Sequence, residues 1–157
     1  MCIRDSLTTV EVGKYLSSLA RELVAIHSAT PNAIRLQTDT HHLLMHIEKA
    51  IPIGLIANEL IINSLKHGLR NREGNLKVTL KPRTQEDGTI WAELSVEDTG
   101  PGLPSDFDVS SAESMGYQLV KLLVRQLRAR LEIGPGPGAR IRIVFPADRS
   151  SALGAHA

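Results

Sequence analysis

Residues 51–67 are apolar on nearly all sides of a helix, yet they carry three polar side chains at fixed spacing. A segment of this kind predicts a helix that is buried against other elements. Glu59, Asn63 and Lys66 recur at i, i+4 and i+7, and at about 100° per residue these positions fall on one face. A carboxylate, an amide and an ammonium group therefore line one wall of a helix whose opposite wall is core.

This polar strip has two interpretations. It could be a solvated helix face, in which a Glu–Asn–Lys network contributes about 0.2–0.5 kcal/mol. Alternatively, it could be the wall of a ligand pocket, because the apolar side chains of Ile56 and Ile62 flank it and binding pockets combine apolar linings with a few polar groups. The helix by itself leaves both interpretations open.

Length and composition limit the remaining choices. The chain has 157 residues, with 18 Lys and Arg against 17 Asp and Glu and only 3% aromatic residues. One compact domain fits this length, and neither a strongly basic nucleic-acid binder nor a base-stacking platform fits this composition. The single cysteine, Cys2, excludes an internal disulfide and a cysteine-based zinc site. With no apolar run of about 18 residues and no signal peptide, we expect a cytoplasmic domain without membrane contact.

The periodicity of the rest of the chain predicts alternating helices and strands. Helices are expected at residues 9–27, from Pro52 in a first turn to about His67 with Gly68 ending it, and from near Ser114. Strands are expected at 33–39, 76–81, 90–97, 131–133 and 141–145, while 41–50 should be irregular or weakly helical. Clean alternation with polar outer faces predicts an open sheet with one solvated side and helices on the other.

A second group of polar residues ends the predicted strand 90–97. Asp98 continues the parity of the inward-facing Leu94 and Val96, so its carboxylate should point toward the core, where an unpaired charge is costly. The amino group of a ligand base would supply the missing donor. Alternatively, Asp98 caps its own backbone in a turn that ends the strand.

A third group opens the helix near Ser114. Gly116 would let backbone N–H groups approach an anion closely, and the helix dipole favours a phosphate there. Ser114 as a plain N-cap explains the same residues equally well.

Taken in order, these pieces resemble the Bergerat (GHKL) ATP-binding fold of histidine kinases, gyrase-type ATPases and Hsp90. IPIGLIANELIINSLKHG is similar to the N box, EDTGPGLP to the first glycine box and SMGYQLVKLLVRQL to the second glycine box of HisKA-2/HWE-type sensor histidine kinases. The resemblance covers roughly residues 9–146. It implies an α/β (α+β) two-layer sandwich, an open mixed sheet with helices on one face.

The resemblance also implies residue roles at the phosphate end of an ATP site. Asn63 matches the asparagine that coordinates the Mg²⁺ bridging the ATP phosphates. Glu59 matches the polarising or general-base position, and with Lys66 it makes up the expected catalytic pair. Lys66 and His67 match positions that face the phosphates.

At the base end, Asp98 matches the aspartate that accepts a hydrogen bond from the adenine amino group. Gly100 and Gly102 would shape that pocket, and residues 103–113 would form a short lid. Gly116 and Leu119 belong to the second glycine box, where the phosphate-binding helix begins. One departure is Gly138-Ala139, where the family usually has Gly-Thr, so a hydroxyl contact to the ligand is not expected from that box.

The expected activity is transfer of the ATP γ-phosphate to a histidine outside this fragment, because no histidine here has the His-Arg-x-x-Asn context of the family's acceptor. We expect residues 1–6 to be non-native, 7–28 to be the tail of a dimerisation/phosphoacceptor helix, 29–147 the ATP-binding domain and 148–157 a disordered tail. Expected partners are the dimerisation/phosphoacceptor helices of the same or a partner kinase and, indirectly, a response-regulator receiver domain.

Two other functions are compatible with the same fold. One is a stand-alone serine kinase of the anti-sigma-factor type, although a helix at 9–27 before the first strand fits a sensor kinase better. The other is a non-catalytic interaction module. The presence of Glu59, Asn63 and Asp98 argues against that module, whereas Ala139 argues slightly for it.

Overall fold

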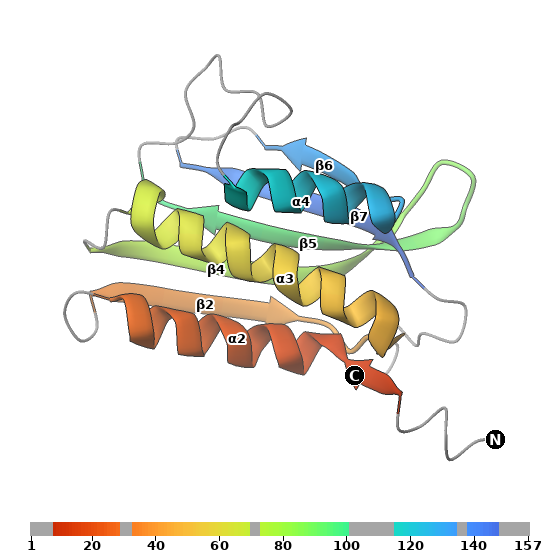
Figure 1. The fold of residues 1–157 in the computed structure, drawn as a ribbon, viewed down its shortest axis with the longest axis horizontal. Coiled ribbons are helices and arrows are strands. Elements are labelled where there is room, and N and C mark those ends of the chain that lie inside the picture. The colour runs from red at the N-terminus through yellow and green to blue at the C-terminus, as the bar shows by residue number, and fades with distance from the viewer. Residues whose placement is uncertain (1–7, 29–32, 70–72, 101–114, 135–137, 148–157) are drawn as a thin grey trace.

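A five-stranded sheet with three helices on one face forms the body of the molecule (Figure 1). The computed structural model describes residues 8–28, 33–69, 73–100, 115–134 and 138–147. The helices are α2 (Val12–His27), α3 (Ile47–Asn63) and α4 (Met115–Gln126). The strands of the sheet are β2 (Ile34–Thr40), β4 (Gly74–Thr84), β5 (Ile90–Asp98), β6 (Arg130–Ile133) and β7 (Arg140–Pro146). Among the described residues, no helix is both long and apolar enough to cross a membrane.

The strand order is β2-β4-β5-β7-β6. β2 and β4 are parallel, and the other neighbouring pairs are antiparallel. The sheet is therefore mixed and has its helices on one face, which confirms the predicted architecture. The register pairs Val78 with Val96 and Leu80 with Leu94, so that the inward-facing residues of β4 and β5 lie side by side under α3.

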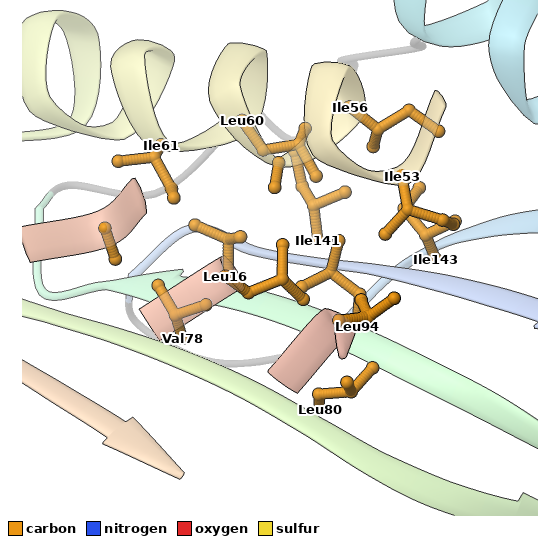
Figure 2. Packing of buried hydrophobic residues seen from close by; sticks show 14 of the residues in the cluster. Leu16, Ile53, Ile56, Leu60, Ile61, Val78, Leu80, Leu94, Ile141 and Ile143 are labelled. Carbon is orange, nitrogen blue, oxygen red and sulfur yellow. The ribbon is translucent and has the colours of Figure 1, made fainter. Parts of the chain in front are cut away.

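The core lies between α3 and the sheet (Figure 2). Ile53, Ile56 and Ile61 are fully buried and Leu60 nearly so, because α3 packs between α2 and α4 as well as over the strands. The side chains that meet it from the sheet and from α2 are Leu16, Val78, Leu80, Leu94, Ile141 and Ile143. This packing confirms the prediction that the apolar helix is buried.

The beginning of α3 differs from the prediction. The helix starts at Ile47, so Pro52 is its sixth residue and not part of its first turn. The Nδ1 atom of His46 caps this earlier start by accepting a hydrogen bond from the backbone N–H of Glu48 (3.3 Å). A proline at the sixth position leaves one carbonyl of the preceding turn without its helical donor. The residues just before α3, expected to be irregular, form strand β3 (Leu44–His46).

The first helix also begins later than its periodicity suggests. Residues 9–11 form strand β1 (Thr9–Glu11), which pairs antiparallel with β3. The Glu11 carboxylate accepts hydrogen bonds from the backbone N–H groups of Gly13 (2.7 Å) and Leu43 (3.1 Å). This single side chain therefore caps α2 and ties it to the segment that leads into β3.

After Asn63 the helical path continues as a π-helix, η1 (Ser64–Gly68). It ends at Gly68, as predicted. A π-helix places its residues at smaller angular steps than an α-helix, so the face of η1 is not a simple continuation of the face of α3.

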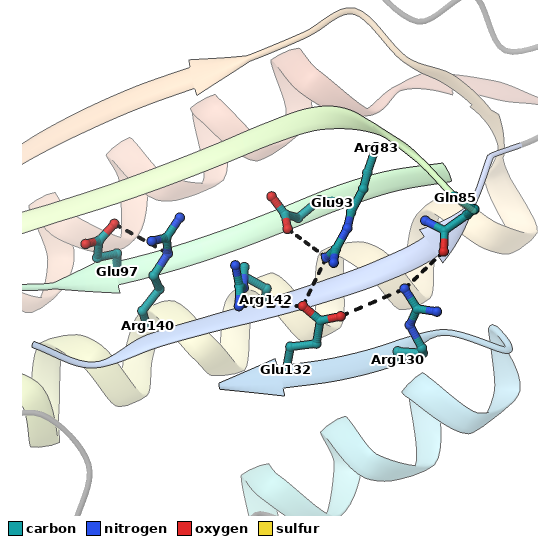
Figure 3. Close-up of polar contacts among 8 residues, drawn as sticks. All are labelled: Arg83, Gln85, Glu93, Glu97, Arg130, Glu132, Arg140 and Arg142. Atoms are coloured by element: carbon teal, nitrogen blue, oxygen red, sulfur yellow. Dashed lines mark hydrogen bonds and ion pairs between the residues drawn. The ribbon is translucent and has the colours of Figure 1, made fainter. Parts of the chain in front are cut away.

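The outer face of the sheet is polar and carries a network of ion pairs (Figure 3). Arg83 donates to Glu93 and to Glu132, both at 3.0 Å. Glu132 also lies 3.6 Å from Arg142 and 3.8 Å from Arg130. The hydrogen bond from Arg83, and the charges of the three arginines, hold the pKa of Glu132 below its usual range.

We expect Glu132→Gln to have a lower free energy of unfolding than wild type at pH 7. In acid, this difference between variant and wild type should disappear. A carboxyl whose pKa is lower in the folded protein stabilises the fold above its ordinary pKa and stops doing so as the pH falls below about 4. Urea unfolding at pH 7, 5 and 3.5 measures the difference between variant and wild type. Glu86→Gln, which removes an exposed carboxylate of the β4–β5 turn, is the control. A difference that stays constant with pH would contradict the assignment.

Candidate functional site

Glu59 and Asn63 lie on the side of α3 that faces the first turn of α4. A Cβ atom added to Gly116 would lie 2.5 Å from Oε2 of Glu59 and 3.9 Å from Nδ2 of Asn63. The backbone of α4 therefore approaches these two side chains as closely as glycine allows. The structure thus brings together a carboxylate, an amide and a helix N-terminus that were predicted from separate sequence segments.

Within the described part of the chain, neither Glu59 nor Nδ2 of Asn63 has a hydrogen-bond or ion-pair partner. Nδ2 of Asn63 is buried and has no hydrogen-bond partner there, and Glu59 is half-buried. Buried polar groups are normally hydrogen-bonded, so an exception requires an explanation. A self-contained Glu–Asn–Lys network does not explain it, because no hydrogen bond or ion pair joins these residues.

Asp98 occupies the end of β5 with its side chain turned inward, as the strand parity predicted. It is 2% exposed and is the one charged residue among the described ones that is buried. Its Oδ1 atom accepts a hydrogen bond from the backbone N–H of Gly100 (2.9 Å), whereas Oδ2 is buried without a described partner. The turn-capping interpretation therefore accounts for one carboxylate oxygen and leaves the other available.

The backbone around Asp98 is held on both sides. Its N–H donates to the carbonyl of Ala139 (2.9 Å), and the N–H of Thr99 donates to the carbonyl of Asn75 (3.2 Å). A Cβ atom on Gly138 would collide with the carbonyl oxygen of Asp98. Gly138 is thus required by close approach of two backbones, and Asp98 projects from a firmly fixed strand end.

Sequence reasoning overlooked Tyr117. It is half-buried, packs against the core and directly follows Gly116. Burial, and then the negative charge of Asp98, raise the pKa of its phenol. The phenol of Tyr117, which follows Gly116, therefore lies within electrostatic reach of Asp98. Its position in the sequence could have drawn attention to it, because it is an aromatic residue with a hydroxyl group directly after the glycine that opens a helix.

The other predicted site residues are placed as follows. Lys66 is exposed on η1 and makes no hydrogen bond or ion pair with a described residue, so its role stays a prediction. Leu119 packs partly buried against the core, which indicates a supporting position. The side chain of His67, Gly102 and the predicted lid at 103–113 lie outside the described residues, as do residues 1–6, Ser114 and 148–157.

Metal binding at the wall would need few protein ligands. The described residues contain no group of three His, Cys, Asp or Glu side chains that could hold a metal ion. Mg²⁺ prefers oxygen ligands and usually takes one or two from the protein, keeping waters and substrate phosphates for the rest. The carboxylate of Glu59 and the amide oxygen of Asn63 fit that donor set.

A groove of about 550 Å³ lies elsewhere on the molecule. Its lining comes from the β4–β5 turn, Trp91 and Arg130, and Trp91 stands at the opposite end of β5 from Asp98. The groove is therefore separate from the candidate site.

Known proteins that are similar to the chain include histidine kinases. Residues 48–149 match the family described as histidine kinase-, DNA gyrase B-, and HSP90-like ATPase. The blue-light-activated histidine kinase 2 of Erythrobacter litoralis is 28% identical over 145 residues, which make up 92% of this chain and 40% of that protein. The solved histidine kinase domain of the Erythrobacter litoralis EL346 blue-light-activated kinase has a TM-score of 0.74 at 26% identity, covering 88% of this chain and 62% of that one.

A third protein of the same fold is ShkA, solved at full length in complex with AMPPNP. It has a TM-score of 0.69 at 20% identity and covers 92% of this chain and 32% of its own. The present chain spans about 40% of the length of the blue-light-activated histidine kinase 2 that it matches. These structures share the Bergerat (GHKL) fold that the sequence predicted.

We expect Gly138→Ala to destabilise the protein by about 1–3 kcal/mol, because the added methyl group meets backbone that cannot move away. Gly134→Ala is the matched control in the same hairpin. There the atoms nearest to the new Cβ belong to the side chain of Arg140, and a flexible side chain can shift. Chemical denaturation of both variants gives the comparison. Equal stability of the two variants would contradict the close approach at Asp98.

Proposed function

Because the chain belongs to the family of histidine kinase-, DNA gyrase B- and HSP90-like ATPases, we propose that it is the ATP- and Mg²⁺-binding catalytic domain of a sensor histidine kinase. The observation that carries this proposal is the pair of buried, unpartnered polar atoms, Nδ2 of Asn63 and Oδ2 of Asp98. Oδ2 of Asp98 is an acceptor that the amino group of a base would satisfy, and Nδ2 of Asn63 is a donor that a phosphate oxygen would satisfy, which leaves the amide oxygen of Asn63 for the metal. The HisKA-2/HWE subtype stays a prediction.

Asp98 would bind the adenine base. A carboxylate that is 2% exposed and holds one oxygen free of partners is costly unless a donor reaches it. The amino group of adenine is such a donor. The hydrogen bond from Gly100 to the other oxygen keeps the carboxylate in one orientation, and a fixed acceptor loses less entropy when the base binds.

The first turn of α4 and the α3 wall would hold the phosphates. Backbone N–H groups at a helix N-terminus, together with the helix dipole, favour an anion. Gly116 lets that turn approach Glu59 and Asn63. Asn63 would contribute its amide oxygen to Mg²⁺, which supplies charge neutralisation at the phosphates. The AMPPNP bound to ShkA, a protein of the same fold, supports a triphosphate nucleotide as the ligand.

The reaction would be phosphoryl transfer to a histidine supplied from outside the described residues. Such transfer depends on positioning and charge stabilisation more than on covalent chemistry by the protein. A nitrogen of the acceptor imidazole forms the new bond to phosphorus, the bond to the bridging oxygen breaks, and ADP leaves. Glu59 makes no hydrogen bond with a described residue. It would accept the proton that the other ring nitrogen of the imidazole loses as the new bond to phosphorus forms.

The partners would be dimerisation/phosphoacceptor helices of the same or a partner kinase and, indirectly, a receiver domain, with the reaction in the cytoplasm. α2 contributes Leu16 and Ala20 to the common core, so this helix folds with the nucleotide-binding part. Whether residues 7–28 also continue a dimerisation helix stays a prediction. The histidine kinases among the similar proteins favour this function over an anti-sigma-type serine kinase or a non-catalytic module.

We expect Asn63→Ala and Asp98→Ala to weaken nucleotide binding in different ways. Asn63→Ala should abolish the gain in AMPPNP affinity that Mg²⁺ provides. Asp98→Ala should weaken binding about tenfold or more with or without the metal, because a hydrogen bond to a charged group is lost. Calorimetric titration with and without Mg²⁺ measures both effects.

Asn58→Ala, on the same helix, and Asp39→Ala, on strand β2, are the matched controls and should leave affinity unchanged. Unchanged AMPPNP affinity in both test variants would refute the assignment of the site.

We also expect the chain to phosphorylate histidine when an acceptor is supplied. Incubation with ATP, Mg²⁺ and the dimerisation helices of a related sensor kinase should label those helices. The label should be lost in acid and kept in base, as for phosphohistidine. Asn63→Ala should give no label. An acid-stable label would instead indicate a serine kinase, and the absence of any label despite AMPPNP binding would favour a non-catalytic module.

A further inference from the structure

Thr99 directly follows Asp98, and its hydroxyl is hydrogen-bonded to the neighbouring strand. The Oγ1 atom of Thr99 accepts a hydrogen bond from the backbone N–H of Asn75 (3.0 Å), and the N–H of Thr99 donates to the carbonyl of Asn75 (3.2 Å). In a regular antiparallel pair, two facing residues exchange both bonds through their backbone carbonyls. Here the hydroxyl of Thr99 takes the place of its carbonyl, and the β4–β5 register ends with the pair of Leu76 and Asp98.

The end of this ladder coincides with a turn back onto Asp98. The backbone N–H of Gly100 donates to Oδ1 of Asp98 (2.9 Å), a turn in which a carboxylate takes the place of a backbone carbonyl. This turn takes the main chain out of the extended path of β5, while the hydroxyl bond keeps Thr99 attached to β4. The carboxylate is thereby held with Oδ1 occupied, and Oδ2 is left without a described partner.

Gly74, the residue before Asn75, confines the hydroxyl of Thr99. Thr99 is exposed as a whole, but a Cβ atom added to Gly74 would lie 3.2 Å from its Oγ1 atom and closer still to Cδ2 of Leu69. A side chain at position 74 would therefore displace one of these two neighbours. Leu69 is buried and directly follows the π-helix that continues α3. The hydroxyl thus lies in a close-packed place between the end of β5 and the segment after Asn63.

The two sides of Asp98 are held in different ways. On the β7 side, its N–H donates to the carbonyl of Ala139, a bond between backbone atoms that no side-chain substitution removes. On the β4 side, one of the two bonds just beyond Asp98 depends on the hydroxyl of Thr99. The orientation of Asp98 therefore depends on which side chain follows it.

We propose that Thr99 is a positioning residue of the nucleotide site, whose hydroxyl holds the Asp98 carboxylate in the orientation that accepts a hydrogen bond from the adenine amino group. This inference rests on the proposed function. A fixed acceptor loses less entropy on binding than one that must first be ordered. Without the hydroxyl, the strand end and the Gly100 turn gain freedom, and the contact between Oδ2 of Asp98 and the amino group becomes weaker.

Thr99→Val is the test variant, because valine keeps the shape of threonine and has no hydrogen-bonding group. We expect it to weaken ADP binding about three- to tenfold, the usual effect of one hydrogen bond. Thr99→Ser keeps the hydroxyl and should restore most of the lost affinity. Thr84→Val, at the opposite end of the same β4–β5 ladder, is the matched control and should leave the affinity unchanged. Calorimetric titration measures the dissociation constant of ADP for each protein.

A second ligand separates positioning of Asp98 from a general effect on the structure. Purine riboside diphosphate has a hydrogen atom in place of the adenine amino group, so it cannot donate to Oδ2 of Asp98. Wild type and Thr99→Val should bind this analogue equally. An equal loss of affinity for ADP and for the analogue would overturn the inference, since that pattern indicates a structural role alone. Unchanged ADP affinity in Thr99→Val, or no recovery in Thr99→Ser, would overturn it as well.

These outcomes are separate from failure of the proposed function. If wild type binds ADP and Asp98→Ala weakens that binding, the ATP-binding assignment stands whatever Thr99→Val does. If wild type binds no adenine nucleotide, the proposed function fails and the role of Thr99 fails with it.

Discussion

Burial of α3 is the constraint on which the rest of the structure depends. The helix is covered by the sheet below and by α2 and α4 at its sides, which is why its sequence is apolar on nearly every side. A helix in that position has few places for polar side chains. Glu59 and Asn63 therefore lie against the backbone of a neighbouring helix rather than in bulk water, and Gly116 makes that approach possible.

The same packing leaves polar side-chain atoms without hydrogen-bond partners on backbone that is rigidly held. Asp98 is fixed by backbone hydrogen bonds to the neighbouring strand and by the close approach of Gly138. A buried group without a partner costs about 1–3 kcal/mol, which a domain of this size can carry if its core is well packed. The outer face of the sheet shows the opposite arrangement. There the carboxylates of Glu93 and Glu132 are paired with arginines and stabilise the fold without contributing to the candidate site.

The sequence alone predicted the features that follow from helical spacing and from the alternation of residues along a strand. Alternation along residues 90–97 places Asp98 on the inner face, and helical spacing places Glu59 beside Asn63. It failed where tertiary contacts override local preference. Pro52 lies inside α3 because the His46 cap and the β1–β3 pairing start the helix five residues earlier. Lys66 was placed by α-helical geometry, but it lies on a π-helical turn, which no periodicity argument anticipates. Tyr117 was overlooked because its significance depends on Asp98, a residue of a different element.

The pieces of the candidate site come from three elements that meet only in the folded chain. Asp98 ends a strand in the middle of the sheet, Asn63 ends α3, and Gly116 with Tyr117 begins α4. Of these, the first turn of α4 lies against the end of α3 through Gly116, and the charge of Asp98 acts on the phenol of Tyr117. A nucleotide that contacts base, metal and phosphate groups at once would bridge all three elements. By linkage such a ligand stabilises the folded state in proportion to the logarithm of its concentration over its dissociation constant. Nδ2 of Asn63 and Oδ2 of Asp98 lack hydrogen-bond partners among the described residues, and contacts made there are the ones through which binding energy would reach the whole fold.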